Sequence, residues 1–303
     1  FLNIILDVLF GLKLVKMEKT EQVFIMIDFC HIVPIPHLDL VKRREVHLVL
    51  AHLIEEDEKY CEFYRNCGAE LIMDNSAFEM YKRGEPMYPT EKLITMAEKV
   101  GARYVVMSDY PKENALKTIS AAYNMMPELV EADIGAFYCP QSEPGDIEGL
   151  IASYGWAFYN PAISYVAFSI LNIPIAYNCE TGNPMQKFLS RWWFMEELDR
   201  RFDLKSIHNK YDKKFHFLGM SEGPNEIKLM SKFHDYIDTW DSSAAAWAGL
   251  NGYKFDNSPT GMINGKFEKE VDFSFETKDS YNINTAKENM NYIDGLCGYG
   301  ITN

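Results

Sequence analysis

Short runs of apolar, β-forming residues recur along the chain and alternate with segments that have helical periodicity. We expect strands at seven places: 46–51, 70–74, 103–109, 134–139, 164–169, 214–220 and 236–241. Residues 90–101 have the apolar spacing of a helix, with Thr90 as the expected N-cap and Gly101 as the residue just past the C-terminus. Residues 225–236 show the same spacing, and the turn-rich segment 256–268 predicts a loop or hairpin near the end of the domain.

Strands that alternate with helices over this length indicate parallel βα units. Seven such units, plus an eighth that the pattern does not place, predict an α/β fold in which one domain, residues 17–303, forms a TIM (β/α)8 barrel. A doubly wound sheet is the alternative. In a TIM barrel the chemistry lies where the strands end.

The first 16 residues are apolar but shorter than the roughly 20 apolar residues that span a bilayer. They also lack the basic region and the cleavage site of a signal peptide. Because Met17 follows, we expect translation to begin there, residues 1–16 to be an extension outside the domain, and the protein not to bind membranes.

Composition narrows the classes of function. The 303 residues are 47% hydrophobic and carry a formal net charge of −14, which argues against a generally basic, nucleic-acid-coating surface but allows a local basic patch. Six cysteines without a Cys-x-x-Cys pair indicate reduced thiols in the cytoplasm. The histidines have no metal-binding spacing, and neither a phosphate-binding glycine loop nor a nucleophile elbow is present.

Polar residues follow four of the expected strands: Asp74, Asp109, Gln141 and Asp241. An aspartate after a strand is often just the N-cap of the next helix. Three at corresponding positions of different strands, however, would converge at one end of a barrel. The small residues that follow Asp241, in "DSSAAAWAG", would leave room for a ligand beside its carboxylate.

Four motifs in chain order resemble the tRNA-guanine transglycosylase superfamily over roughly residues 46–255. "LIMDNSAFE" (71–79) is similar to its Asp-Ser-Gly-Gly-Phe loop, and "YVVMSDYP" (104–111) to its Val-Phe-Asp-Glu strand end. The stretch 214–252 resembles its late strands, where a Leu-Met-Gly-Val-Gly-type turn precedes a D-x-F-D strand. "AHLIEEDEKYCEFY", "DNSAFE" and "SPTGMINGKFEKEVDF" look like its phage, DpdA-like branch, whose members insert 7-deazaguanine bases into DNA.

This resemblance implies a pentosyltransferase with two catalytic carboxylates. Asp241 would attack C1′ of a guanosine sugar, expel guanine and leave a glycosyl-enzyme that a second base resolves with net retention. Asp74 would act as general acid and base, which near neutral pH needs a raised pKa. Phe78 would stack on the purine, although a core aromatic is an equal alternative.

The same resemblance implies how the base is bound. Asp109 would accept hydrogen bonds from the guanine N1–H and amine, and Gln141 would face the base carbonyl. Leu218 and Gly219 would line the other face of the base.

The chain also departs from the family pattern. Ser76-Ala77 replaces the Gly-Gly of the loop, and Asn75 replaces its serine. The tRNA enzymes carry a zinc-binding Cys-x-Cys-x-x-Cys and a histidine after the nucleophile, whereas here only Cys297 follows Asp241. Four-coordinate zinc needs four ligands. We therefore expect no zinc module, metal or other cofactor, and favour DNA over tRNA as substrate.

The expected partners are a nucleic acid and a free 7-deazaguanine base, with a second copy or another protein as a further candidate, in the cytoplasm of a phage-infected host. The best basic stretch, 187–214, holds eight lysines and arginines around Trp192 and Trp193. It could bind phosphates, but an amphipathic helix with both tryptophans buried is the favoured interpretation. A smaller basic candidate is 41–45.

Three other functions stay open. The first is the same base exchange on tRNA. The second is a catalytically silent barrel that serves as a binding subunit. The third is a retaining glycosidase or base-excising glycosylase, because the same carboxylates could serve water in place of a second base.

Overall fold

The chain folds into a TIM (β/α)8 barrel, shown by a computed structural model that describes residues 26–179, 184–221, 223–259, 261–262, 267 and 269–298. The expected extension, residues 1–16, lies outside the described residues. The strands are β1 (Asp28–His31), β2 (Val46–Leu50), β3 (Glu70–Asp74), β4 (Tyr104–Val106), β5 (Gly135–Tyr138), β6 (Ile163–Ser169), β7 (Lys214–Leu218) and β8 (Thr239–Ser242). All paired strands are parallel, in the order β1-β8-β7-β6-β5-β4-β3-β2. Contacts between β1 and β2 bring the sheet nearly to closure.

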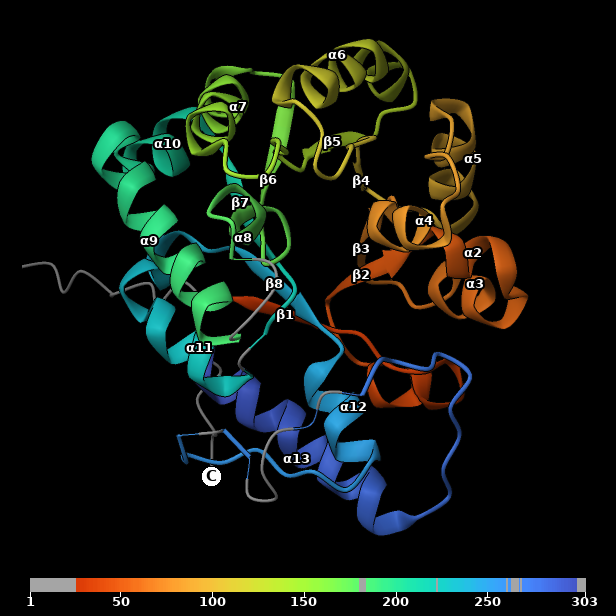
Figure 1. The fold of residues 1–303 in the computed structure, drawn as a ribbon. Coiled ribbons are helices and arrows are strands. Elements are labelled where there is room, and N and C mark those ends of the chain that lie inside the picture. Colours follow the sequence, from red (N-terminus) through yellow and green to blue (C-terminus); the bar gives the residue numbers. More distant parts are fainter. Residues whose placement is uncertain are drawn as a thin grey trace, which may run out of the picture.

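Helices form a ring around the strands (Figure 1). They are α2 (Ala51–Glu56), α3 (Glu58–Arg65), α4 (Ala77–Arg83), α5 (Thr90–Val100), α6 (Ala115–Glu131), α7 (Ile147–Tyr159), α8 (Asn172–Ala176), α9 (Pro184–Phe202), α10 (Leu204–Tyr211), α11 (Pro224–Leu229), α12 (Ala244–Leu250) and α13 (Ser280–Leu296). The described residues also form two 3-10 helices, η1 (Ile35–Leu40) and η2 (Met230–Tyr236). Within the described ranges, no helix combines the length and apolar character needed to cross a membrane.

All seven expected strands are confirmed, and the eighth is β1. Its four residues include Asp28 and His31, so it lacks a recognisable apolar run. It is a strand because it pairs with β8, with Cys30 opposite Asp241. His31 also bonds to Asp294 of α13, at 3.0 Å. The pairing with β8, and not the local sequence pattern, therefore determines that these residues form a strand.

The expected helices are confirmed with changes at their ends. The helix at 90–101 begins at Thr90 itself, after Pro89, so Thr90 is not its N-cap. Gly101 ends it as expected, with a left-handed φ of 76°. The segment 225–236 is divided between α11 and η2. An antiparallel bridge joins Phe255 to Met262 within the expected hairpin, part of which lies outside the described residues.

The small residues after Asp241 serve mainly to pack two helices together. Ser242 and Ser243 do line a cavity beside Asp241, as expected. The alanines and glycine that follow form α12, which is buried and packs against α13. A Cβ on Gly249 would lie 2.3 Å from Ala286 Cα. The expectation that the whole run leaves room for a ligand is therefore wrong beyond Ser243.

This packing predicts opposite effects for two glycine substitutions. Gly249→Ala should lower the free energy of unfolding by about 1–3 kcal/mol, because the added methyl group meets backbone that cannot move away easily. The matched control is Gly295→Ala in α13, where nothing lies within 4 Å of the new Cβ. It should raise stability by about 0.5–1 kcal/mol. Urea unfolding measures both, and an unchanged stability of Gly249→Ala would contradict the close packing.

Candidate functional site

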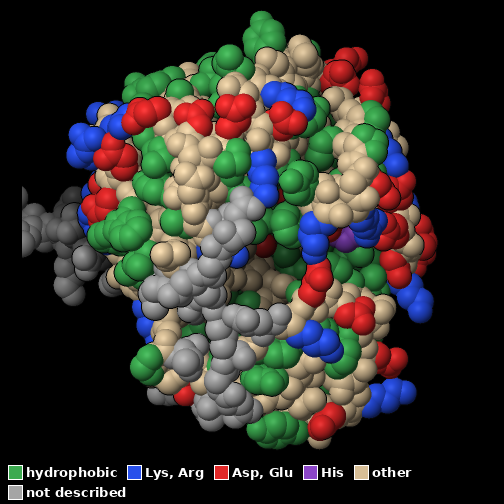
Figure 2. All heavy atoms as spheres, in the orientation of Figure 1, with side chains coloured by type: hydrophobic (Ala, Val, Ile, Leu, Met, Phe, Trp, Pro, Cys, Tyr) green, Lys and Arg blue, Asp and Glu red, His purple; other side chains and the backbone are tan. Residues whose placement is uncertain are grey.

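A cavity of about 960 Å³ opens where the strands end. It is lined by all seven residues that the sequence predicts for the site: Asp74, Phe78, Asp109, Gln141, Leu218, Gly219 and Asp241. They come from β3, α4, β7, β8 and the loops after β4, β5 and β7. Figure 2 shows a hollow near the middle of this face, with lysine and arginine side chains gathered around it. Parallel strands thus bring residues 167 positions apart in the sequence, Asp74 and Asp241, to one cavity.

Asp241 is a buried carboxylate with one oxygen held in place. Its Oδ1 accepts hydrogen bonds from the Gly219 backbone N–H, at 3.1 Å, and lies 3.0 Å from Nε2 of His216. Nδ1 of His216 lies in turn 2.6 Å from Oγ1 of Thr239. His216 is completely buried, on β7 beside β8. Among the described residues Oδ2 has no such partner, so this oxygen is available to a ligand in the cavity.

The loop that carries Gly219 is held by a buried ion pair. Arg191 of α9 and Glu226 of α11 bond to each other, and both side chains are inaccessible to water. Arg191 also donates to the carbonyl oxygens of Leu218 and Gly219, at 3.1 and 3.0 Å. Trp240 Nε1 donates to the same Gly219 oxygen at 2.9 Å. These contacts fix the peptide whose N–H reaches Asp241.

Asp74 ends β3 and meets the pKa requirement of a general acid. Burial raises its pKa well above the usual value, and the neighbouring carboxylates add to the effect, Glu79 first and Asp109 and Asp241 after it. The Ser76 backbone N–H, which donates to Asp74 at 2.9 Å, opposes the shift. Burial likewise raises the pKa of Glu79. Asp74 is therefore suited to hold a proton near neutral pH.

The residue after Asn75 adopts a strained backbone. Ser76 has a left-handed φ of 57°, which glycine adopts without strain. Its side chain compensates, because Oγ accepts the His52 backbone N–H at 3.2 Å and lies 2.8 Å from His52 Nδ1. Burial lowers the pKa of His52 to about 4, so its ring is neutral. The serine that replaces a glycine of the resembled loop is thus tied to α2.

Asp109 lies at the centre of a buried amide network. Asn75 Nδ2 donates to its Oδ1 at 2.7 Å, and Gln141 Nε2 donates to its Oδ2. Burial raises the pKa of Asp109 to about 6, against the lowering effect of these hydrogen bonds. Gln141 Oε1 is buried and accepts no hydrogen bond from the described residues. The Gln141 side chain therefore has an acceptor atom, Oε1, that is not used by the described residues.

Phe78 lies at the cavity mouth with 40% of its surface exposed, so it is not a core aromatic. Four basic residues also line the cavity: Lys82, Arg83, Lys112 and Lys187. Lys82 pairs with Glu270, and Arg83 with Glu56. The mouth therefore carries four cationic side chains, two of them paired with carboxylates, above the acidic floor.

The basic stretch 187–214 does not form one phosphate-binding surface. Arg191, one of its eight basic residues, is completely buried and cannot reach a phosphate, and Lys213 is buried against the carbonyls of Asn160 and Ile163. Arg200 and Arg201 pair with acidic side chains. Within the described part of the stretch, Lys187 alone lines the cavity.

The single amphipathic helix favoured for this stretch is divided: α9 covers it up to Phe202, α10 follows, and Lys214 begins β7. Trp192 packs partly buried against the core. Trp193, however, is 47% exposed, so the expectation that both tryptophans are buried is wrong for it.

Two chemically important residues of this site, Glu79 and His216, were not predicted from the sequence. Glu79 stands in the quoted "DNSAFE" motif, in the first turn of α4, where a carboxylate near Asp74 could have been noticed. His216 stands two residues before Leu218 on β7, and alternate strand residues point to the same face. The two-residue spacing from Leu218 was therefore the sequence signal that could have pointed to His216. No group of three or more His, Cys, Asp or Glu among the described residues is arranged to hold a metal ion.

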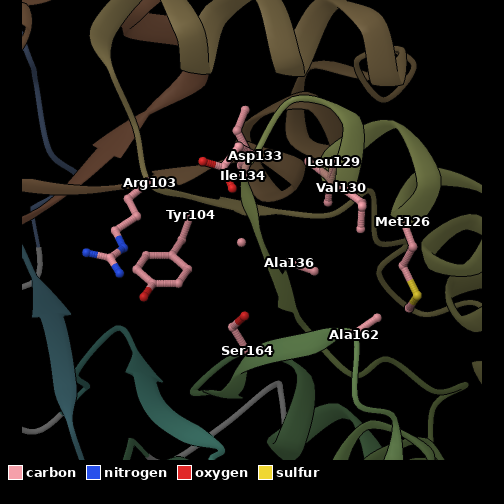
Figure 3. A pocket seen from close by; sticks show the side chains of 11 residues that line it. Arg103, Tyr104, Met126, Leu129, Val130, Asp133, Ile134, Ala136, Ala162 and Ser164 are labelled. Atoms are coloured by element: carbon pink, nitrogen blue, oxygen red, sulfur yellow. The ribbon is translucent and has the colours of Figure 1, made fainter.

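A second cavity, of about 620 Å³, lies at the opposite end of the barrel (Figure 3). It is lined by residues at the starts of β4 and β5, including Arg103, Tyr104 and Gly135, and by Leu129 and Val130 of α6. None of the residues predicted for the site lines it. In TIM barrels the reaction site lies at the carboxyl ends of the strands, so the first cavity is the functional candidate.

Comparisons with known proteins identify no family. No model of a protein family matches the chain, and no curated protein does. Among solved structures, an HpcH/HpaI aldolase from Desulfitobacterium hafniense DCB-2 is similar with a TM-score of 0.42 and 10% identity, covering 72% of this chain and 86% of that one. D-Psicose 3-epimerase from Clostridium cellulolyticum H10, with D-tagatose, is similar with a TM-score of 0.44 and 7% identity, covering 90% and 96%. These similarities are too distant to carry an inference about the reaction.

Proposed function

We propose that the protein is a base-exchanging transglycosylase that replaces guanine by a 7-deazaguanine base in DNA. The observation that carries this proposal is the meeting of three carboxylates, Asp74, Asp109 and Asp241, in one cavity. Their surroundings differ. Asp74 has a pKa raised by burial, whereas Asp241 offers one oxygen to the cavity. Pairs of carboxylates in unlike environments can divide acid and nucleophile roles between them.

The reaction follows from these positions in two balanced steps. In the first, Asp241 Oδ2 forms a bond to C1′ while the bond from C1′ to N9 breaks, and Asp74 protonates the departing guanine. In the second, Asp74 takes the N9 proton of the incoming base, which attacks C1′ as the C1′–Oδ2 bond breaks and its electron pair returns to Asp241. Two inversions give net retention.

The other lining residues fit the binding of a purine. Asp109 accepts two hydrogen bonds and has lone pairs left for the N1–H and amine of a guanine-type base. Gln141 Oε1 offers a further acceptor. Phe78 at the mouth presents a ring on which a base can stack, and the basic rim supplies charge for phosphates. DNA is preferred to tRNA because the zinc ligands of the tRNA enzymes have no counterpart after Asp241.

A test of base exchange follows guanine release from guanine-labelled DNA and, separately, from tRNA, each with and without 7-cyano-7-deazaguanine. Release should occur from DNA, require the added base and fall at least about a thousandfold in Asp241→Asn, because the nucleophile is lost. The matched control is Asp235→Asn, an exposed carboxylate outside the cavity, which should keep full activity.

Each other outcome contradicts a part of the proposal. Release from tRNA alone would make tRNA the substrate. Release without added base would indicate an excising glycosylase. Absence of release from either polymer would favour a catalytically silent barrel.

The raised pKa of Asp109 predicts how base binding depends on pH. The donors of a guanine-type base require the ionised carboxylate, so affinity should fall below about pH 6, approaching tenfold per pH unit. Asp74 and Glu79 face the same cavity and also have raised pKa values, so they could contribute to the pH dependence. The variant Asp109→Asn is the control that separates their contribution from that of Asp109. That variant should bind weakly and lose most of the dependence. Titration of free guanine by calorimetry between pH 5 and 8 measures this, and a flat profile in the wild type would contradict the assigned role.

A further inference from the structure

The contact between His216 and Asp241 allows the proton on the ring to be placed. Both side chains are buried, and the ring stands between two oxygens: Asp241 Oδ1 at 3.0 Å from Nε2, and Thr239 Oγ1 at 2.6 Å from Nδ1. Oδ1 also accepts the Gly219 N–H, which marks it as an acceptor. An Nε2 lone pair facing this oxygen would leave two buried acceptors in contact, which is costly. Nε2 must therefore carry hydrogen.

The Thr239 hydroxyl completes the arrangement. Unlike the carboxylate, a hydroxyl can donate or accept, so Thr239 Oγ1 can bond to Nδ1 while Nε2 donates to Asp241. Thr239 is opposite His216 in the ladder between β7 and β8, and stands two residues before Asp241 on the same strand. The backbone register of two strands thus holds hydroxyl, imidazole and carboxylate in a row.

We propose that His216, oriented by Thr239, is the positioning residue of Asp241. Its Nε2–H and the Gly219 N–H hold Oδ1, which selects Oδ2 as the oxygen that attacks. The reaction part of this inference rests on the proposed function. When Oδ2 bonds to C1′, Oδ1 becomes the carbonyl oxygen of the ester and keeps both hydrogen bonds. When the ester breaks, the same two donors receive the returning negative charge.

The proton position can be measured without any activity. The protein has seven histidines, so selective ¹⁵N labelling of histidine gives a spectrum in which His216→Gln identifies the His216 signals by their loss. In the wild type at neutral pH, Nε2 should be protonated. Thr239→Val should change the Nδ1 signal, and Thr239→Ser should restore it. A wild-type ring protonated on Nδ1 alone would overturn the inference.

The kinetic test compares variants that remove or keep the donor. His216→Phe keeps a buried ring without a donor, and should lower the rate of exchange at saturating base by about a hundredfold with little change in KM. His216→Gln can place an amide N–H near the position of Nε2 and should recover about tenfold of that loss. Equal losses in both variants, with unchanged melting temperatures, would mean that a donor facing Oδ1 does not account for the effect of His216, and would overturn the inference.

The two tests separate this inference from the proposed function. If the wild type exchanges no base, the proposed function fails, and the NMR spectrum still decides where the His216 proton lies. If the wild type exchanges bases and His216→Phe does so at the wild-type rate, the proposed function stands and the positioning role fails.

Discussion

The parallel direction of all eight strands places every carboxyl end on one side of the barrel, and the candidate site depends on this constraint. Asp74 ends β3, Leu218 ends β7, and Asp241 is the third residue of the four in β8. None of these side chains is near another in the sequence. A one-residue change in strand register would turn the Asp241 side chain to the outer face, so the ladder between β1 and β8 is also a condition for the proposed function.

Gathering carboxylates in a buried cavity has an energetic cost, and the structure offsets it in two ways. Some of the charge is removed, because burial raises the pKa values of Asp74, Glu79 and Asp109. Elsewhere, fixed donors take the place of water, as Asn75 and Gln141 do for Asp109. The Asp241 carboxylate receives its donors from β7 and from the loop that Arg191 holds. Stability and the proposed chemistry thus depend on the same hydrogen bonds.

The sequence predicts those parts of the fold that local pattern controls. Seven strands follow from β-forming apolar runs, and the carboxylates follow from their positions at strand ends in a barrel. β1 does not follow, since only its pairing with β8 makes it a strand. Arg191 reads as a surface charge in an amphipathic helix, yet its partner Glu226 is 35 residues away and lies on another helix.

The same difference between local pattern and tertiary contact applies to the residues of the candidate site. That Asp241 lines the cavity is predictable from its strand, but its bond to His216 depends on the register between β7 and β8. The small residues after Asp241 predicted room for a ligand. The alanines among them instead pack against α13, which lies far along the chain. Local sequence therefore indicates where the reactive groups lie, while tertiary contacts determine which atoms they present.

The central claim is that Asp241 bonds covalently to the sugar, and the most direct measurement is the mass of the trapped intermediate. A reaction of the protein with a short guanine-containing DNA, stopped with acid before any second base is added, should contain protein that is heavier by the DNA minus guanine. Peptide mapping should place this adduct on Asp241, and Asp241→Asn should not form it. An adduct on another residue, or base exchange without any adduct, would contradict the account.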